Sequence, residues 1–320
     1  MQFSRRSMIF GMLGSSLAST GAFASGVQID GGLAFGSSWR ITTDDSTDLA
    51  RIKPIVEAII AEVDNQMSPY RASSHLSIFN AARAQVWTPM PSAFCHVAAQ
   101  ALRIAKLTDG AFDPTVGPTV SRYGFGPIKG GSGHFSEIDV TATAIHKKAR
   151  HLTLDLCGIA KGYALDRIAA ALMRAGVANA LVEVGGEVKA LGHHPSGRFW
   201  NVAIADPTAA EFRTQRIIHP GRYALATSGH SANGLRGPIG TSHIIDPHHG
   251  KPASTVLMSV SVLTETATEA DALATALCAA GPEAGVALAR RLNVAALFVV
   301  DGVSKPSEVT TGRFANHILV

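Results

Sequence analysis

The stretch Asp155–Asp166 reads DLCGIAKGYALD and places a carboxylate, two glycines and a lysine where the chain changes its pattern. Before it, residues 149–156 (ARHLTLDL) alternate polar and apolar side chains, which predicts a strand that delivers Asp155 at its end. After it, residues 162–176 carry apolar side chains at helical spacing, and Gly176 is a typical helix stop. The stretch is therefore a predicted junction between a strand and a helix.

Two interpretations of this junction stay open on the residues alone. In the structural one, Gly158 and Gly162 only ease the turn into the helix. In the functional one, the small residues let backbone N–H groups approach a phosphate, and Lys161 neutralises its charge. The second interpretation predicts a nucleotide site.

Around the junction, the chain predicts an α+β fold. Residues 33–43 (LAFGSSWRITT) predict a strand, and residues 179–192 (NALVEVGGEVKALG) and 199–207 (FWNVAIADP) predict a pair of strands. Residues 48–68 and 267–281 have the apolar spacing of amphipathic helices. Strands and helices mix without strict alternation, so a mixed sheet with flanking helices is favoured over a doubly wound α/β fold.

The composition is that of a folded globular protein. The 320 residues are 46% hydrophobic and 16% charged, with a formal net charge of +4. No run of Lys or Arg is dense enough for a nucleic-acid track, so we expect no nucleic-acid partner. The cysteines are odd in number and widely spaced, which predicts no disulfide framework.

Residues 1–24 have the pattern of a twin-arginine export signal. They contain Arg5 and Arg6, no acidic residue, a modest apolar stretch and the small-x-small pattern of Ala22-Phe23-Ala24. Glycines interrupt the apolar stretch, which makes it a poor membrane span. We therefore expect a periplasmic protein whose mature domain, residues 25–320, has no membrane span.

Three further motifs hold residue types suited to ligand chemistry. Asp113 sits in TDGAFDPTVGP, where a structural turn and a ligand contact explain the acid about equally well. His243 and Asp246 lie three apart before a turn, and a buried structural histidine is the alternative. Asp271 and Thr275, at i and i+4, share one helix face and suit Mg²⁺ when phosphates complete its shell; an exposed polar face is the alternative.

Taken together, these motifs resemble the ApbE family of FAD:protein FMN transferases, which are exported flavin-handling enzymes. The resemblance runs from about Phe35 to the C-terminus and implies an ApbE-like, T-fold-like architecture. The blocks that carry it, in chain order, are MSPYRASSHLSIFN, TDGAFDPTVGPTVSRYGFGP, DLCGIAKGYALDRIA, LVEVGGEV, ATSGH, SHIIDPHHGKP and SVSVLTETATEADALATAL.

The resemblance implies a set of site residues, matched motif by motif. The positions that match FAD contacts are Phe35, Tyr70, Ala111, Phe112, Asp113, Asp155, Lys161 and Ile245. The positions that match the Mg²⁺ site are the backbone carbonyl of Gly158 with Asp271 and Thr275. His243 matches the histidine implicated in the transfer.

The implied reaction moves FMN from FAD to a threonine of an exported or membrane-bound electron-transfer protein and releases AMP. Mg²⁺ would spread the charge of the leaving AMP, and His243 would accept the proton of the threonine hydroxyl, with Asp246 as an orienting partner. Two alternatives stay open. One is an FAD pyrophosphatase that gives FMN and AMP, and the other is a periplasmic flavin-binding protein without turnover.

The chain also departs from the family pattern. Cys157 stands where relatives have the first glycine of Asp-Leu-Gly-Gly, and a small filler is favoured over a redox role. The segment 230–241 is short of the aromatic residues that relatives carry in a hairpin there. His248 and His249 are adjacent, which favours a solvated turn over a zinc site.

Overall fold

The computed structural model describes residues 26–131, 133–209, 211–230, 234, 241–302 and 305–320. Its strands are β1 (Val27–Ala34), β2 (Ser37–Asp44), β3 (Thr88–Pro89), β4 (Ile138–Val140), β5 (Ala144–Lys147), β6 (Ala180–Val184), β7 (Glu187–Leu191), β8 (Val202–Ala205), β9 (Thr214–Ile218), β10 (Ala224–Gly229), β11 (Ile245–Asp246), β12 (Lys251–Pro252), β13 (Leu257–Thr264), β14 (Ala295–Val300) and β15 (Ser307–Thr311). Its helices are α1 (Leu49–Met67), α2 (His75–Ala81), α3 (Ser92–Leu107), α4 (Gly117–Arg122), α5 (Ala160–Arg174), α6 (Ala267–Ala280) and α7 (Pro282–Arg291), with short 3₁₀ helices η2 (Phe135–Glu137) and η4 (Phe314–His317). The predicted export signal, residues 1–24, lies outside the described residues.

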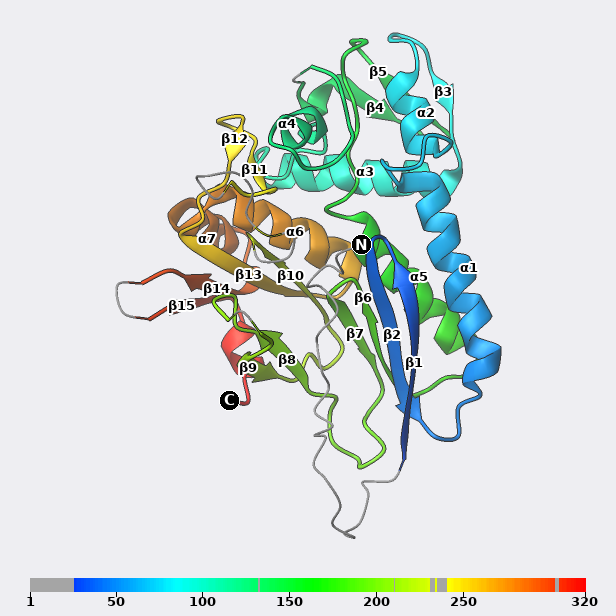
Figure 1. The fold of residues 1–320 in the computed structure, drawn as a ribbon, viewed down its shortest axis with the longest axis vertical. Coiled ribbons are helices and arrows are strands. Elements are labelled where there is room, and N and C mark those ends of the chain that lie inside the picture. Colours follow the sequence, from blue (N-terminus) through cyan, green and yellow to red (C-terminus); the bar gives the residue numbers. More distant parts are fainter. Residues whose placement is uncertain (1–25, 132, 210, 231–233, 235–240, 303–304) are drawn as a thin grey trace.

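The main sheet has eight strands in the order β1–β2–β6–β7–β10–β13–β14–β15 (Figure 1). The α+β class is confirmed, but the sheet is not mixed: every pairing in it among the described strands is antiparallel. Tight hairpins explain two of these pairings, because two-residue turns join β1 to β2 and β6 to β7, and such turns reverse the chain direction. The predicted pairing of residues 179–192 with 199–207 is wrong, since 179–192 holds both β6 and β7, and β8 pairs with β9.

The prediction of one strand over residues 33–43 is wrong. Ala34 pairs with Ser37, so the chain turns back at Phe35 and Gly36 and divides the segment between β1 and β2. Both turn residues have positive φ angles, 50° for Phe35 and 73° for Gly36. That backbone matches the mirror-image turn that two-residue hairpins favour, and Gly36 adopts it without a steric penalty.

Different elements pack against the two faces of the main sheet. Helices α1, α5 and α6 pack on one face, where Trp39, Ile41 and Val182 meet Leu165 and Ile168 in one buried cluster. The β8–β9 hairpin and η4 cover part of the other face. Helices α2, α3 and α4 and the small sheet β3–β5–β4 form a cap that lies above α6 and at the upper ends of α1 and α5 in Figure 1.

The predicted strand over residues 149–156 is also absent, although its leucines are buried, and Thr153 is buried between them. Leu152, Leu154 and Leu156 are fully buried. The backbone finds its partners outside any strand: the Asn80 side chain bonds both the N–H and the carbonyl of Leu154, at 2.7 and 2.9 Å. A single amide side chain thus satisfies groups that a neighbouring strand would otherwise bond.

The predicted helices are confirmed. The prediction over residues 162–176 corresponds to α5, which ends at Arg174, and the prediction over 267–281 corresponds to α6, which ends at Ala280. The prediction over 48–68 corresponds to α1, whose first turn is capped by the Asp48 side chain. No helix in the described part of the chain has the length and apolar character needed to cross a membrane.

Candidate active site

A cavity of roughly 1410 Å³ opens between the main sheet, α6 and the cap. Its walls come from the β1–β2 turn, the end of α1, the loop after α3, the start of α5, the β6–β7 turn, the end of β10, and α6. The structure brings all the residues that the sequence predicted for the site to this one cavity: Phe35, Tyr70, Ala111, Phe112, Asp113, Asp155, Gly158, Lys161, His243, Ile245, Asp271 and Thr275.

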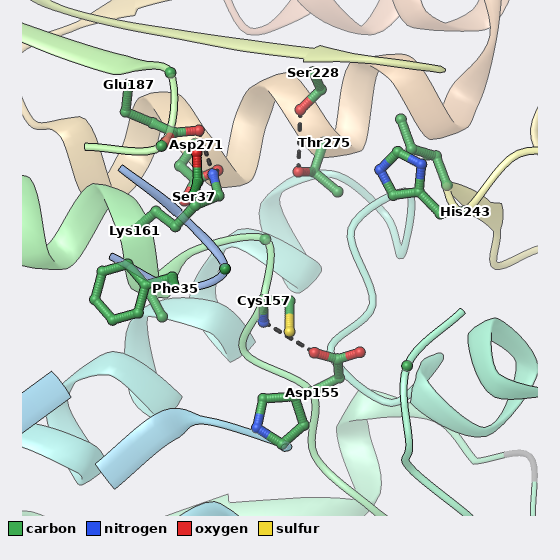
Figure 2. A pocket seen from close by; sticks show the side chains of 18 of the residues that line it. Phe35, Ser37, Asp155, Cys157, Lys161, Glu187, Ser228, His243, Asp271 and Thr275 are labelled. Atoms are coloured by element: carbon green, nitrogen blue, oxygen red, sulfur yellow. Dashed lines mark hydrogen bonds and ion pairs between the residues drawn. The ribbon is translucent and has the colours of Figure 1, made fainter. Parts of the chain in front are cut away.

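An aromatic side chain stands at the tip of the β1–β2 hairpin. Phe35 has a φ of 50°, a left-handed conformation that is uncommon for a bulky residue and concentrates at functional sites. Its ring is partly buried against the core and lines the cavity. The turn thus holds a flat apolar surface at the cavity wall (Figure 2).

The loop after α3 forms a buried shelf. Ala111 and Phe112 are each 4% exposed, and Asp113 is buried beside them. The Asp113 carboxylate accepts hydrogen bonds from the backbone N–H and the hydroxyl of Thr115, at 2.8 and 2.7 Å. Burial nevertheless raises the pKa of Asp113, since the loss of water disfavours its charged form. Tyr70, by contrast, is exposed at the rim.

Asp155 stands at the entry to α5. Its Oδ1 accepts the backbone N–H of Cys157 at 2.9 Å, and its own N–H donates to the carbonyl of Pro114 at 2.7 Å (Figure 2). These bonds aim a carboxylate at the cavity. Burial is the main cause that raises the pKa of Asp155. Cys157 is exposed and lines the same cavity.

A buried charge cluster lies beyond the start of α5. The Lys161 Nζ donates to Glu187 Oε1 and, at 3.1 Å, to Asp271 Oδ1. The two carboxylate side chains are each 3% exposed and the lysine side chain 14%. The second oxygen of Asp271 accepts the backbone N–H of Gly162 at 3.0 Å. Figure 2 shows the three charged side chains gathered at one end of the cavity.

Oxygen donors suited to a hard cation lie next to this cluster. The Thr275 hydroxyl is 3.3 Å from that of Ser228, and a Cβ on Gly158 would come within 3.1 Å of the Thr275 Oγ1. Gly158 is thus the residue type that lets the α5 loop approach α6 so closely. Carboxylate, hydroxyl and carbonyl oxygens are ligands that Mg²⁺ prefers, and Asp271, Thr275 and Gly158 supply one of each.

The donor set fits Mg²⁺ only if a ligand's phosphates contribute as well. Among the described residues, no group of three or more His, Cys, Asp or Glu side chains could hold a metal ion by itself. The ionised side chains of Lys161, Glu187 and Asp271 sum to one negative charge, and a buried negative charge favours a nearby cation.

His243 lines the cavity apart from this cluster, with its ring centroid 5.8 Å from that of Phe125. Asp246, the partner considered for it, is engaged elsewhere. Its carboxylate accepts the backbone N–H of His248 at 3.0 Å and contacts the His249 ring nitrogen at 2.6 Å. Both of these histidines are exposed in a turn, as expected.

Sequence reasoning missed a second histidine. His230 is 5% exposed, and its Nδ1 lies 2.6 Å from the hydroxyl of Ser242, next to His243. Its Nε2 lies 3.2 Å from the carbonyl oxygen of Ser254, so Nε2 carries the proton and the Ser242 hydroxyl donates to Nδ1. Burial lowers the pKa of His230 and favours this neutral form. His230 therefore anchors the segment that carries His243.

Glu187 and Ser228 were missed too. Glu187 had a signal, because a charged side chain that opens an apolar strand after two glycines is unusual in a core sheet. For Ser228, the sequence contains no signal of a functional role beyond its place in the ATSGH block. Most of the divergent segment 230–241 lies outside the described residues.

Comparison with known proteins identifies the family. Residues 35–298 match the model of the ApbE family. A FAD:protein FMN transferase of Vibrio cholerae is 33% identical over 287 residues, which cover 84% of this chain and 86% of that protein.

Solved structures are similar as well. The flavin transferase ApbE from Vibrio cholerae superposes with a TM-score of 0.82 at 31% identity and covers 91% of this chain and 99% of its own. The apo form of the Pseudomonas stutzeri flavinyl transferase ApbE gives a TM-score of 0.83 at 31% identity, with 94% and 99% covered. The chain belongs to the ApbE family.

Proposed function

We propose that this protein is a FAD:protein FMN transferase that uses Mg²⁺, modifies a threonine hydroxyl of an acceptor protein and releases AMP. Relatives described as FAD:protein FMN transferases support the reaction class. The observation that carries the proposal is the shared cavity. An apolar shelf, the Asp155 carboxylate, the buried Lys161 cluster and His243 all line this cavity of roughly 1410 Å³.

The cavity supplies each kind of contact that FAD needs. Phe35 and Phe112 offer apolar faces to a flavin ring system. The carboxylate of Asp155 can accept hydrogen bonds from a sugar hydroxyl or a base N–H. The Lys161 ammonium, which lines the cavity, can offset the charge of pyrophosphate oxygens. FAD is therefore the proposed substrate.

Asp271, Thr275 and the carbonyl of Gly158 are the proposed Mg²⁺ ligands. Bound there, the ion would offset negative charge on the pyrophosphate as the bond to AMP breaks. The chain's own part is to hold these oxygens in place: the Gly162 N–H and Lys161 fix the Asp271 carboxylate, and Ser228 contacts the Thr275 hydroxyl.

In the proposed step, the threonine Oγ of the acceptor forms a bond to the phosphorus of the FMN moiety. The bond between that phosphorus and the oxygen bridging to AMP breaks, and AMP leaves with the electron pair. The hydroxyl proton passes to an imidazole nitrogen of His243. The Phe125 ring packs near that imidazole, and the His230–Ser242 contact holds its chain segment.

The same step with water as the nucleophile would make the protein an FAD pyrophosphatase, and binding without any step would make it a flavin carrier. The test is to incubate the protein with FAD and Mg²⁺, with and without an acceptor peptide containing threonine, and to separate the products. Transfer predicts AMP and covalently modified peptide. AMP with free FMN at an equal rate in both samples would favour hydrolysis, and no AMP would favour a carrier.

We also propose export to the periplasm by the twin-arginine route, supported by the pattern of residues 1–24. Replacing both Arg5 and Arg6 by lysine should leave the precursor in the cytoplasm of a host that has this route. Cell fractionation with and without the substitution measures it. Unchanged export would contradict the proposed route while leaving the enzymatic proposal intact.

A further inference from the structure

The Lys161 ammonium group bonds the Asp271 carboxylate, which is the carboxylate proposed to bind the cation. The Lys161 Nζ lies 3.1 Å from Asp271 Oδ1, and it also bonds Glu187 Oε1. A divalent cation at Asp271 and the ammonium at the same oxygen would repel each other, because two positive charges a few ångströms apart interact strongly in a buried site. Any cation that uses Asp271 must therefore share it with Lys161 or shift Lys161 toward Glu187.

Strand register and the β6–β7 turn determine the position of Glu187. Val184 pairs with Glu187 across the Gly185–Gly186 turn, so Glu187 faces the helices on the same side of the sheet as Val184. A Cβ on Gly185 would lie 3.0 Å from the Lys161 Cδ, so the glycine leaves room for the lysine stem to reach the carboxylate. The buried carboxylate is thus placed for Lys161 rather than for solvent.

We propose that Glu187 is a positioning residue: it retains the Lys161 ammonium when a divalent cation takes up Asp271. This inference depends on the proposed Mg²⁺ site. With Glu187 ionised, the three side chains sum to one negative charge, and Lys161 keeps a partner after it yields Asp271. Without the charge of Glu187, Lys161 and Asp271 neutralise each other. The cation must then compete with the Lys161 ammonium for Asp271, the one carboxylate left in the cluster.

The inference predicts an order of cation affinities that a structural role would not produce. Mn²⁺, which prefers the same oxygen ligands as Mg²⁺, can be titrated into the purified protein saturated with FAD, in the absence of any acceptor, and followed by electron paramagnetic resonance. Glu187→Gln should weaken Mn²⁺ binding on the order of tenfold to a hundredfold. Lys161→Met should bind more tightly than wild type. The double variant should recover to about the wild-type affinity, since its cluster again carries one negative charge.

Glu183→Gln is the matched control. Glu183 is another buried carboxylate of the β6–β7 hairpin, it pairs with Arg40 at 2.6 Å, and it lies outside the large cavity. Pairing with Val188 places it on the opposite face of the sheet from Glu187. This variant should bind Mn²⁺ like wild type, and circular dichroism with thermal unfolding checks that every variant is folded.

Three results would overturn the inference, and they differ in what else they overturn. Normal Mn²⁺ binding by folded Glu187→Gln, or a double variant that binds no better than Glu187→Gln, would contradict the role of Glu187 alone. Absence of Mn²⁺ binding by wild type would contradict both this role and the proposed metal site. The predicted order among the four proteins would support both.

Discussion

The carboxylate of Asp271 on α6 accepts the backbone N–H of Gly162 on α5 at 3.0 Å, across 109 positions of the chain. The contact is possible because Gly162 has no side chain: a Cβ there would lie 2.1 Å from the carbonyl oxygen of Ala267. A close approach of the two helices is therefore also the contact that orients a proposed cation ligand. Packing and site chemistry depend on the same glycine.

Gly162→Ala should accordingly lower both the stability of the protein and its affinity for the cation. The added methyl group must push α5 and α6 apart, and overpacking of this kind destabilises a core by about 1–3 kcal/mol or more. Thermal unfolding should show a lower Tm, and Mn²⁺ titration should show weaker binding because Asp271 loses its backbone donor.

Gly285→Ala is the control for that experiment. Its Cβ would lie 2.4 Å from the carbonyl oxygen of Leu277, at the contact of α7 with α6, and Gly285 does not line the cavity. A comparable loss of Tm with unchanged Mn²⁺ affinity is expected. Equal effects of both substitutions on Mn²⁺ binding would contradict the special role of the Gly162 contact.

Asp271→Asn tests the charge at this position while keeping an oxygen for the Gly162 N–H. The variant should fold, because the helix contact persists. FAD cleavage should fall by about a hundredfold or more, since the proposed cation loses its charged ligand. The measurement is AMP release against Mg²⁺ concentration, and an unchanged Mg²⁺ dependence would remove Asp271 from the metal site.

How much of the fold the sequence could predict depends on how far apart in the sequence the contacting residues lie. The helical spacing in 162–176 and 267–281 is local, so α5 and α6 were predicted correctly. The alternation in 149–156 predicted a strand, but the partner of the Leu154 backbone is the Asn80 side chain, 74 positions away, and only the burial of the leucines agrees with the pattern. Periodicity reports which side chains are buried, and it says nothing about which group bonds the backbone.

The candidate site shows the same limit. Motif resemblance predicted residues that the fold brings to one cavity, yet no local pattern links Lys161 to Glu187, 26 positions away in a different element. The Ser228–Thr275 contact spans 47 positions and was equally hidden. His230 was overlooked because its partners, Ser242 and Ser254, lie 12 and 24 positions further along the chain.

Asp155→Asn should stabilise the protein at neutral pH while weakening FAD binding. Burial raises the pKa of Asp155 above its ordinary value of 3.8, so the folded state disfavours the charged form. Asparagine removes that charge and keeps an oxygen for the Cys157 N–H. Thermal unfolding and fluorescence titration of FAD measure the two effects.

The sign of the pH dependence follows from linkage. Between pH 3.8 and the raised pKa, the folded state binds more protons than the unfolded state, so this carboxyl's contribution to the free energy of unfolding falls as pH rises. The stability gain of Asp155→Asn should thus be largest at neutral pH and shrink as the pH approaches 3.8. A gain that grows toward acid would contradict the burial of this charge.

His243→Ala should lower transfer by about a hundred- to ten-thousand-fold, because a general base typically contributes that much. FAD affinity should change little, since the base need only touch the attacking hydroxyl. The assay is the mass shift of the acceptor beside FAD titration. Transfer at the wild-type rate by the variant would exclude His243 as the base.

His230→Ala gives the contrasting result expected of a structural histidine. Its loss leaves the buried hydroxyl of Ser242 and the carbonyl of Ser254 without their ring partners, which costs about 1–3 kcal/mol for each group left unsatisfied. Tm and transfer should fall together. A variant of normal stability would contradict the anchoring role of this residue.

The central claim is tested most directly by the intact mass of an acceptor protein after incubation with this enzyme, FAD and Mg²⁺, with AMP quantified in the same sample. The account predicts one FMN phosphoryl group on a threonine for each AMP released, and no modification when that threonine is replaced by valine. AMP release with an unmodified acceptor, or modification that persists in the valine variant, would contradict it.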